Sequence, residues 1–246
     1  MHSATVLVSV VVFALLPVHA LAHHGKEYLI TSTYKTPERG SFFFLWSSQY
    51  TSSRNYEREF EFEPGLLYGL TNRWSLEVHT HHALSTLDFE MESIALETRV
   101  RLFGPDDSHG EEFEDSHRGR DPFSVAVLLE YEKGFGEELD ALEGRVIVGR
   151  QFRSISLVAN VIGERNLEEG EKVHYRYTIG VKKNLSSAFG FGLELDGGLH
   201  KGNGFSLTPG LYGVITSGFD YRLGPSFGFG GRSEEFELRA TLLFEL

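Results

Sequence analysis

A period-two alternation of polar and apolar residues runs through most of this chain, and it constrains the fold more than any other feature. In residues 56–63, which read YEREFEFE, the aromatic residues share one face of an extended chain and the glutamates share the other. Residues 235–246 repeat this pattern, with Leu243 as the exception. Such alternation over about 9–13 residues predicts β-strands. About twelve such segments follow Gly40: 40–50, 57–70, 74–82, 90–103, 123–132, 142–150, 155–163, 174–183, 188–198, 205–215, 219–229 and 235–246.

The length and chemistry of these segments favour strands that cross a membrane. Most are longer than the usual strand of about 5–6 residues in soluble sheets, and they match the roughly 9–11 residues of a tilted membrane-spanning strand. Nearly every segment sets a charged row against an apolar or aromatic row, and aromatic residues recur near the segment ends, where interfacial girdles lie. The pattern therefore predicts an outer-membrane barrel, and the alternative is a secreted soluble β-protein such as a jelly roll or a lipocalin-like fold.

The short spacing between segments sets the topology. It leaves no room for crossover helices, so neighbouring strands must pair as antiparallel hairpins. Because lipid forbids open sheet edges, the sheet must close, and bacterial single-chain barrels use even strand counts. We expect a closed antiparallel up-and-down barrel of about twelve strands over 40–246, with ten or fourteen as alternatives, and both chain ends in the periplasm. Short turns then follow the even strands, and the acidic segment 104–122 conflicts with this rule.

The first 22 residues are typical of a secretory signal peptide. Residues 5–16 are almost all apolar, and Ala20-Leu21-Ala22 forms a small-x-small cleavage pattern. The alternative is an uncleaved anchor helix, but the apolar run is short of the roughly 20 residues that a spanning helix needs. We expect residues 23–39 to form an N-terminal periplasmic segment. We also expect export to the bacterial outer membrane, where the partners of the chain would be the membrane lipid and the barrel-assembly machinery.

Composition excludes several other classes. The chain has no Cys, which removes disulfide frameworks and thiolate metal sites. Its 35 acidic and 23 basic residues give a formal charge of -12, whereas proteins that bind nucleic-acid backbones carry a basic excess. With 24% charged residues and one long apolar run, a helical membrane protein is also disfavoured.

The polar face of the predicted strands should line the lumen, and it carries an acidic surplus. Seven basic residues lie on it: Arg99, Arg101, Arg145, Arg176, Lys182, Arg222 and Arg239. Thirteen acidic residues lie on it: Glu57, Glu59, Glu61, Glu63, Glu77, Glu97, Glu130, Glu132, Glu143, Glu194, Asp196, Asp220 and Glu237. An acidic surplus favours cations. We expect a channel that passes small solutes with weak cation selectivity; the alternative is a closed structural or adhesin-like barrel, in which these charges only satisfy one another.

One short segment resembles a known family. Residues 65–78, GLLYGLTNRWSLEV, are similar to the strand–turn–strand of the MetA-like, phenol-degradation-associated outer-membrane transporter group, in which a Tyr-Gly pair precedes a Thr-Asp/Asn-Arg turn. Residues 223–226, LGPS, are similar to the penultimate strand of that group. The resemblance implies a channel or transporter role with a poorly defined substrate, and these pieces mark architecture more than chemistry.

Metal and catalytic signals are weaker. His79 and His81 lie two apart, which places both on one strand face beside Glu77, and imidazole suits Zn, Cu or Ni. The alternative is a solvated, His-rich strand end. Outer-membrane lipid hydrolases carry His-x-Ser on one strand, and none of the eleven His is followed two residues later by Ser. We therefore expect no enzymatic activity and no cofactor.

Overall fold

The structure, a computed structural model, describes residues 27–52, 58–84, 89–104, 123–186, 188–200, 202–230 and 236–246. No α-helix in these ranges is long and apolar enough to cross a membrane. The described residues form twelve strands: β1 (Phe42–Ser52), β2 (Arg58–Thr71), β3 (Trp74–Leu84), β4 (Phe89–Phe103), β5 (Phe123–Gly134), β6 (Ala141–Phe152), β7 (Ile155–Asn166), β8 (His174–Asn184), β9 (Phe189–Gly198), β10 (Phe205–Thr216), β11 (Phe219–Phe229) and β12 (Phe236–Glu245).

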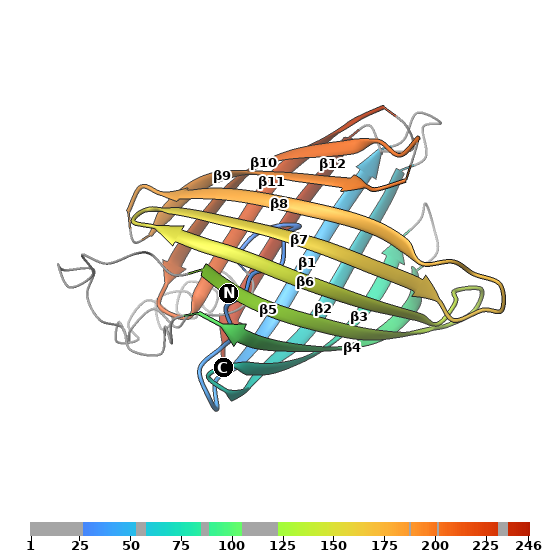
Figure 1. Cartoon of the computed structure of the whole chain (residues 1–246), viewed down its shortest axis with the longest axis horizontal. Coiled ribbons are helices and arrows are strands. Elements are labelled where there is room, and N and C mark those ends of the chain that lie inside the picture. Colours follow the sequence, from blue (N-terminus) through green and yellow to red (C-terminus); the bar gives the residue numbers. More distant parts are fainter. Residues whose placement is uncertain are drawn as a thin grey trace, which may run out of the picture.

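These strands close into one antiparallel barrel (Figure 1). Each strand pairs with its neighbours in sequence, and β1 pairs with β12 from Phe43↔Glu245 to Ser52↔Phe236, which completes the ring. The prediction of a closed twelve-stranded up-and-down barrel is confirmed.

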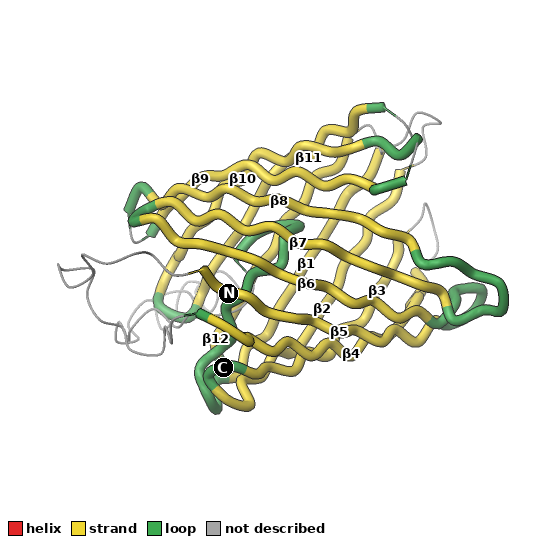
Figure 2. The backbone as a smooth tube through the Cα atoms, viewed as in Figure 1, coloured by secondary structure: helices red, strands yellow, loops and turns green. Residues whose placement is uncertain are grey.

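The connections sort to the two ends of the barrel as strand parity requires (Figure 2). One end, the even-turn end, carries the connections after β2, β4, β6, β8 and β10 together with the C-terminus. The short turns 72–73 and 153–154 lie there. Gly104 and Phe123 lie at this end too, so the connection between β4 and β5 obeys the parity of the barrel despite its length; residues 105–122 themselves lie outside the described ranges. The opposite end is the odd-turn end.

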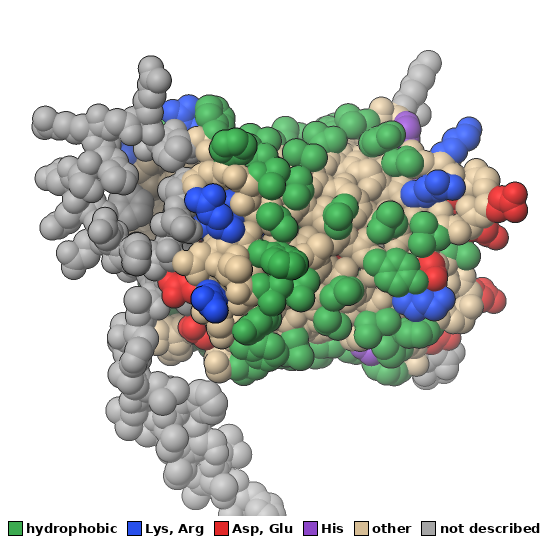
Figure 3. Space-filling view, turned by 60° about the horizontal axis from the view of Figure 1, so that its bottom comes forward, with side chains coloured by type: hydrophobic (Ala, Val, Ile, Leu, Met, Phe, Trp, Pro, Cys, Tyr) green, Lys and Arg blue, Asp and Glu red, His purple; other side chains and the backbone are tan. Residues whose placement is uncertain are grey.

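The outer surface of the barrel is apolar around its middle. Along β4 and β7, exposed residues such as Leu96 and Val161 alternate with buried ones such as Glu97 and Ile162. In Figure 3 the hydrophobic side chains form a band, and the Lys, Arg, Asp and Glu side chains gather toward its two margins. An apolar band between polar rims is the outer surface expected of a barrel in lipid.

Residues 27–39 lie inside the barrel, and we refer to them as the plug. In Figure 1 this segment enters the interior and returns to the even-turn end, where β1 begins. Tyr28, Thr33 and Tyr34 are almost fully buried. The prediction of an N-terminal periplasmic segment over residues 23–39 stays a prediction, and the described part of that range packs against the inner wall.

The inner wall is apolar where the plug packs. Tyr28 and Tyr34 form one buried cluster with inward side chains of β5, β6, β7 and β10: Ala126, Leu128, Ile147, Val158 and Tyr212. A second cluster contains Phe43, Leu45, Leu67 and Leu243, which joins β1, β2 and β12. Leu243, the exception to the alternation, thus faces inward because it belongs to an interior apolar cluster.

Candidate functional site

The plug is held chiefly by one buried carboxylate on β9. The side chain of Glu194 is fully buried and accepts hydrogen bonds from three consecutive backbone N–H groups, those of Leu29 (2.7 Å), Ile30 (2.8 Å) and Thr31 (2.7 Å). The hydroxyl of Tyr212 donates a fourth, at 2.8 Å. Four donors satisfy a charge that burial would otherwise make costly.

Arginines of the wall bind residues 32–35 of the plug. The guanidinium of Arg99 donates to the carbonyl oxygens of Thr33 (3.4 Å) and Lys35 (3.3 Å) and pairs with Glu97 at 2.7 Å. The guanidinium of Arg145 donates to the hydroxyl of Ser32. The bonds from Arg99 satisfy backbone carbonyls of a segment that has no regular secondary structure.

Contacts near the tip and the base of the plug complete its attachment. The hydroxyl of Tyr28 donates to the carbonyl of Ser156 at 3.1 Å, and burial raises the pKa of Tyr28, so this hydroxyl stays a neutral donor. The ammonium of Lys182 lies 5.4 Å from the centre of the Tyr28 ring and 3.7 Å from the carboxylate of Glu27. At the even-turn end, the hydroxyl of Thr36 donates to the carbonyl of Asn72 at 2.8 Å.

Glycines of the wall leave room for the plug. A Cβ at Gly180 would lie 2.7 Å from the ring of Tyr28, and one at Gly224 would overlap the carbonyl oxygen of Pro209 and lie 2.8 Å from the side chain of Leu29. A Cβ at Gly149 would overlap the ring of Tyr34. Because real Cβ atoms do not approach other atoms so closely, the wall of β6, β8 and β11 is shaped for these three side chains.

Charge is distributed unevenly along the lumen. In the plugged half, the inward strand residues that are buried or half-buried comprise four acidic side chains (Glu77, Glu97, Glu194, Asp220) and four basic ones (Arg99, Arg101, Lys182, Arg222). Toward the odd-turn end, the inward half-buried residues in the described ranges comprise ten carboxylates and three arginines. The carboxylates are Glu59, Glu61, Glu63, Glu92, Glu130, Glu132, Glu143, Glu164, Asp196 and Glu237, and the arginines are Arg145, Arg176 and Arg239. We call this half the acidic vestibule.

Each arginine of the acidic vestibule lies beside a carboxylate. Arg145 pairs with Glu143 and Arg239 with Glu237, both at 2.6 Å and both two residues apart on one strand. Arg176 lies 3.5 Å from Asp196 and 3.8 Å from Glu164. These pairs leave the vestibule with a surplus of carboxylates over arginines.

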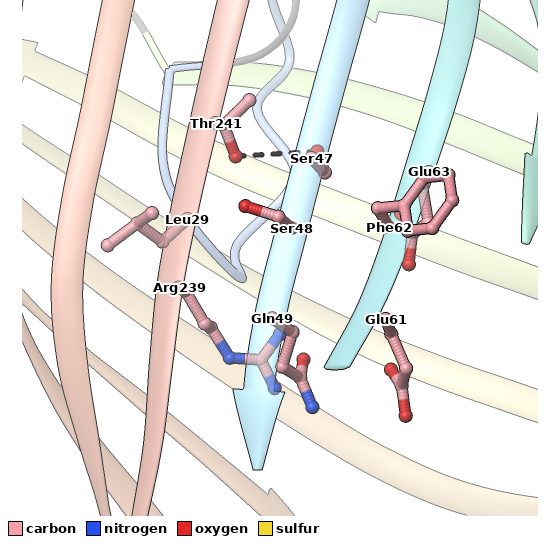
Figure 4. A pocket seen from close by; sticks show the side chains of 9 residues that line it. All are labelled: Leu29, Ser47, Ser48, Gln49, Glu61, Phe62, Glu63, Arg239 and Thr241. Carbon is pink, nitrogen blue, oxygen red and sulfur yellow. Dashed lines mark hydrogen bonds between the residues drawn. The ribbon is translucent and has the colours of Figure 1, made fainter. Parts of the chain in front are cut away.

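A polar cavity lies where the vestibule meets the plug (Figure 4). It is lined by residues of β1, β2 and β12, among them Gln49, Glu61 and Arg239, and by Leu29 of the plug. Its volume is about 60 Å³, and since one water needs roughly 10–15 Å³, it has room for a few waters.

Most of the predicted lining residues are buried or half-buried. Glu77, Glu97, Arg99, Arg101, Lys182 and Arg222 are buried in the plugged half. Glu59, Glu61, Glu63, Arg145, Arg176, Asp220, Glu237 and Arg239 are half-buried. Glu57 lies outside the described residues.

The two candidate metal ligands lie side by side on β3. The rings of His79 and His81 are 5.0 Å apart, and Nδ1 of each lies near a carboxylate oxygen, of Glu77 at 3.5 Å and of Glu63 at 3.4 Å respectively. Within the described ranges, no group of three His, Asp or Glu side chains is arranged to hold a metal ion. A metal at His79 and His81 stays a prediction, which a titration of the unfolding temperature with Zn²⁺ would test.

Sequence reasoning missed the plug. Its signals were present as breaks in the alternation: inward Leu128, Ile147 and Val158 where the other strands place polar residues, and glycines at inward positions. An apolar patch on a polar inner face indicates that something covers it.

Comparisons with known proteins place the fold among outer-membrane barrels. No family model matches the chain, and no curated protein matches it. Among solved structures, the COG4313 outer membrane channel from Pseudomonas putida F1 is similar with a TM-score of 0.59 at 10% identity, covering 87% of this chain and 98% of that one. The KdgM porin is similar with a TM-score of 0.56 at 10% identity, covering 83% and 99%. The beta domain of the Bordetella autotransporter BrkA is similar with a TM-score of 0.50 at 12% identity, covering 84% and 99%. At such identities the likeness shows the fold.

Proposed function

We propose that this protein is an outer-membrane channel that passes small polar solutes and favours cations, with the plug narrowing its even-turn end. The observation that carries the proposal is the lumen's division into a balanced, plugged half and an acidic vestibule with ten carboxylates and three arginines. In a barrel that served only as a rigid support, such a surplus would add only repulsion between like charges.

The size of the barrel agrees with a narrow passage. Barrels of about 8 strands are filled by side chains, and those of about 16 leave an aqueous channel, so twelve strands are intermediate. The plug takes up part of that interior, which restricts solutes to small ones. The acidic row Glu59, Glu61 and Glu63, together with Glu57, would supply the cation preference.

The shared fold does not transfer a substrate. The KdgM porin has been solved in complex with oligogalacturonate, which is a chain of acidic sugars. The acidic vestibule is unfavourable for such a polyanion, because like charges repel in a low-dielectric lumen. The proposed substrates are therefore small cations and neutral polar solutes. The proposal includes export through the N-terminal signal and insertion by the barrel-assembly machinery, and it assigns no enzymatic activity to the chain. Membership in the MetA-like group is supported only by the resemblance of residues 65–78 and 223–226.

A second function, a closed structural or adhesin-like barrel without conductance, is favoured by the plug itself. Glu194, Arg99 and Lys182 contact it from buried positions on the wall. In that case the charges of the vestibule would serve contacts at the surface of the protein and would have no part in transport.

Planar-bilayer recordings of the full chain under a KCl gradient separate the two functions. A channel gives steps of conductance with a reversal potential that indicates cation preference. Replacing Glu59, Glu61 and Glu63 by Gln should move the reversal potential toward zero, whereas Glu169→Gln, in the exposed connection at the same end, should leave it unchanged. Folded protein without conductance would support the closed barrel, and anion preference would overturn the proposed selectivity.

A further inference from the structure

A pair of aromatic rings holds one arginine at the outer rim of the barrel. Arg150 lies near the end of β6, and its side chain faces outward because Val146 and Val148 face outward on the same strand. Its guanidinium carbon lies 4.3 Å from the centre of the Phe152 ring and 4.9 Å from that of Phe123. Stacking on two rings fixes the guanidinium in place and leaves its planar edge for another partner.

Two further basic side chains lie near Arg150 at the even-turn end. Lys183, on β8, is exposed, and Arg153 is exposed in the turn between β6 and β7. Arg150 pairs in register with Leu157 and Lys183 with Ile155, so the two basic residues stand on strands that flank β7. With strands about 4.8 Å apart and a rise of about 3.4 Å per residue, two strand spacings and a two-residue offset place their Cα atoms roughly 12 Å from each other across the surface.

The surroundings of this basic group are apolar and aromatic. Phe123, Phe189 and Phe191 are all exposed on neighbouring strands at the same rim. The outward positions of β6, β7, β8 and β9 carry no Asp or Glu in the described residues. The opposite rim differs, since the connections there at 135–140 and 167–173 carry the acidic residues Glu137, Glu138, Asp140, Glu168, Glu169 and Glu171.

We propose that Arg150, Lys183 and Arg153 bind the phosphate of an anionic glycerophospholipid at the even-turn rim of the barrel. Charge complementarity identifies the occupant: the basic group lies at the margin of the apolar band, where headgroup phosphates meet a membrane protein. Arg150 supplies a planar, bidentate donor for phosphate, and Lys183 supplies a point charge. The exposed phenylalanines pack against the upper acyl chains. This proposal rests on the barrel lying in a membrane and not on its conducting.

Native mass spectrometry of the full chain in a zwitterionic detergent tests the proposal. Phosphatidylglycerol and phosphatidylcholine with identical acyl chains are titrated, and we expect the intact protein to retain the first more strongly. Arg150→Gln and Lys183→Gln should each weaken phosphatidylglycerol binding by about fivefold, since a basic residue near such a surface contributes about 1 kcal/mol. Arg165→Gln is the matched control, because Arg165 is an exposed, outward arginine near the odd-turn end.

The outcomes are distinct. Loss of the phosphatidylglycerol preference in the Arg150 and Lys183 variants, with the control unchanged, supports the site. Equal retention of both lipids by the intact protein, or an equal loss in the control, overturns it. Tighter retention of lipid A through the same residues also overturns it, because the occupant would then be lipopolysaccharide. If Arg150→Gln fails to fold, as heat-modifiable gel mobility would reveal, the exposed Lys183→Gln decides alone.

Discussion

The carboxylate of Glu194 lies 2.7 Å from the backbone nitrogen of Leu29, across 165 residues of sequence, and this contact attaches the N-terminal segment to the barrel wall. Two further backbone N–H groups and the Tyr212 hydroxyl donate to the same carboxylate. The plug therefore depends on one side chain more than on any other.

Replacing Glu194 with Gln should destabilise the folded barrel by about 3 kcal/mol, because hydrogen bonds to a charged group contribute about 1.5–3 kcal/mol each and an amide NH₂ cannot accept from the backbone donors. Urea unfolding followed by tryptophan fluorescence measures the change. Asp196→Asn on the same strand is the control and should cost at most about 1 kcal/mol. Equal losses in the two variants would mean that Glu194 has no special part in holding the plug.

Gly149→Ala and Gly180→Ala should each destabilise the protein, because the added methyl group would meet the ring of Tyr34 or Tyr28. Overpacking of this kind costs about 1–3 kcal/mol. Gly144→Ala on β6 is the matched control, since its Cβ would make an ordinary contact of 3.6 Å with Leu129. If all three variants unfold at the same urea concentration, the wall is not shaped around the plug.

Removing the two plug rings should widen the passage. Tyr28→Ala combined with Tyr34→Ala empties the apolar cluster on the inner wall, and we expect a larger single-channel conductance than that of the unaltered chain. The control is Tyr131→Ala, which removes an exposed ring from the outer surface. Unchanged conductance in the double variant would show that ions do not pass beside the plug.

Asp140, in the connection before β6, should give a small pH dependence of stability. The Lys133 ammonium, 2.7 Å away, together with hydrogen bonds from Tyr131 and Gly134, lowers the pKa of Asp140. A carboxyl whose folded pKa is below its unfolded value, about 3.9, stabilises the fold above that value and loses the contribution as the pH falls through the lowered pKa. Asp140→Asn should therefore be less stable than the unaltered protein at pH 7 and equally stable at pH 2. If the difference in stability between the two proteins persists at pH 2, the effect belongs to another group.

Alternation predicted the barrel well because lipid and lumen impose opposite demands on adjacent residues. The strand containing Phe236 and Leu238 was placed within one residue of its observed bounds for this reason. The same reasoning could not find the plug, because Tyr28 and Tyr34 lie in a segment without periodicity. It also could not show that acidic residues such as Glu59 and Glu237 gather toward one end, since position along the lumen depends on the stagger between strands.

The N-terminal segment also bears on the order of assembly. Its partners are spread from the turn between β2 and β3 to β11, so it can dock only when most of the wall has formed, although its residues are made before those of every strand. Contacts between residues so far apart in sequence form late, because closing the intervening chain costs entropy first. We therefore expect a folding intermediate in which the strands have paired and water fills the lumen. Docking of the plug then converts this intermediate into the native barrel.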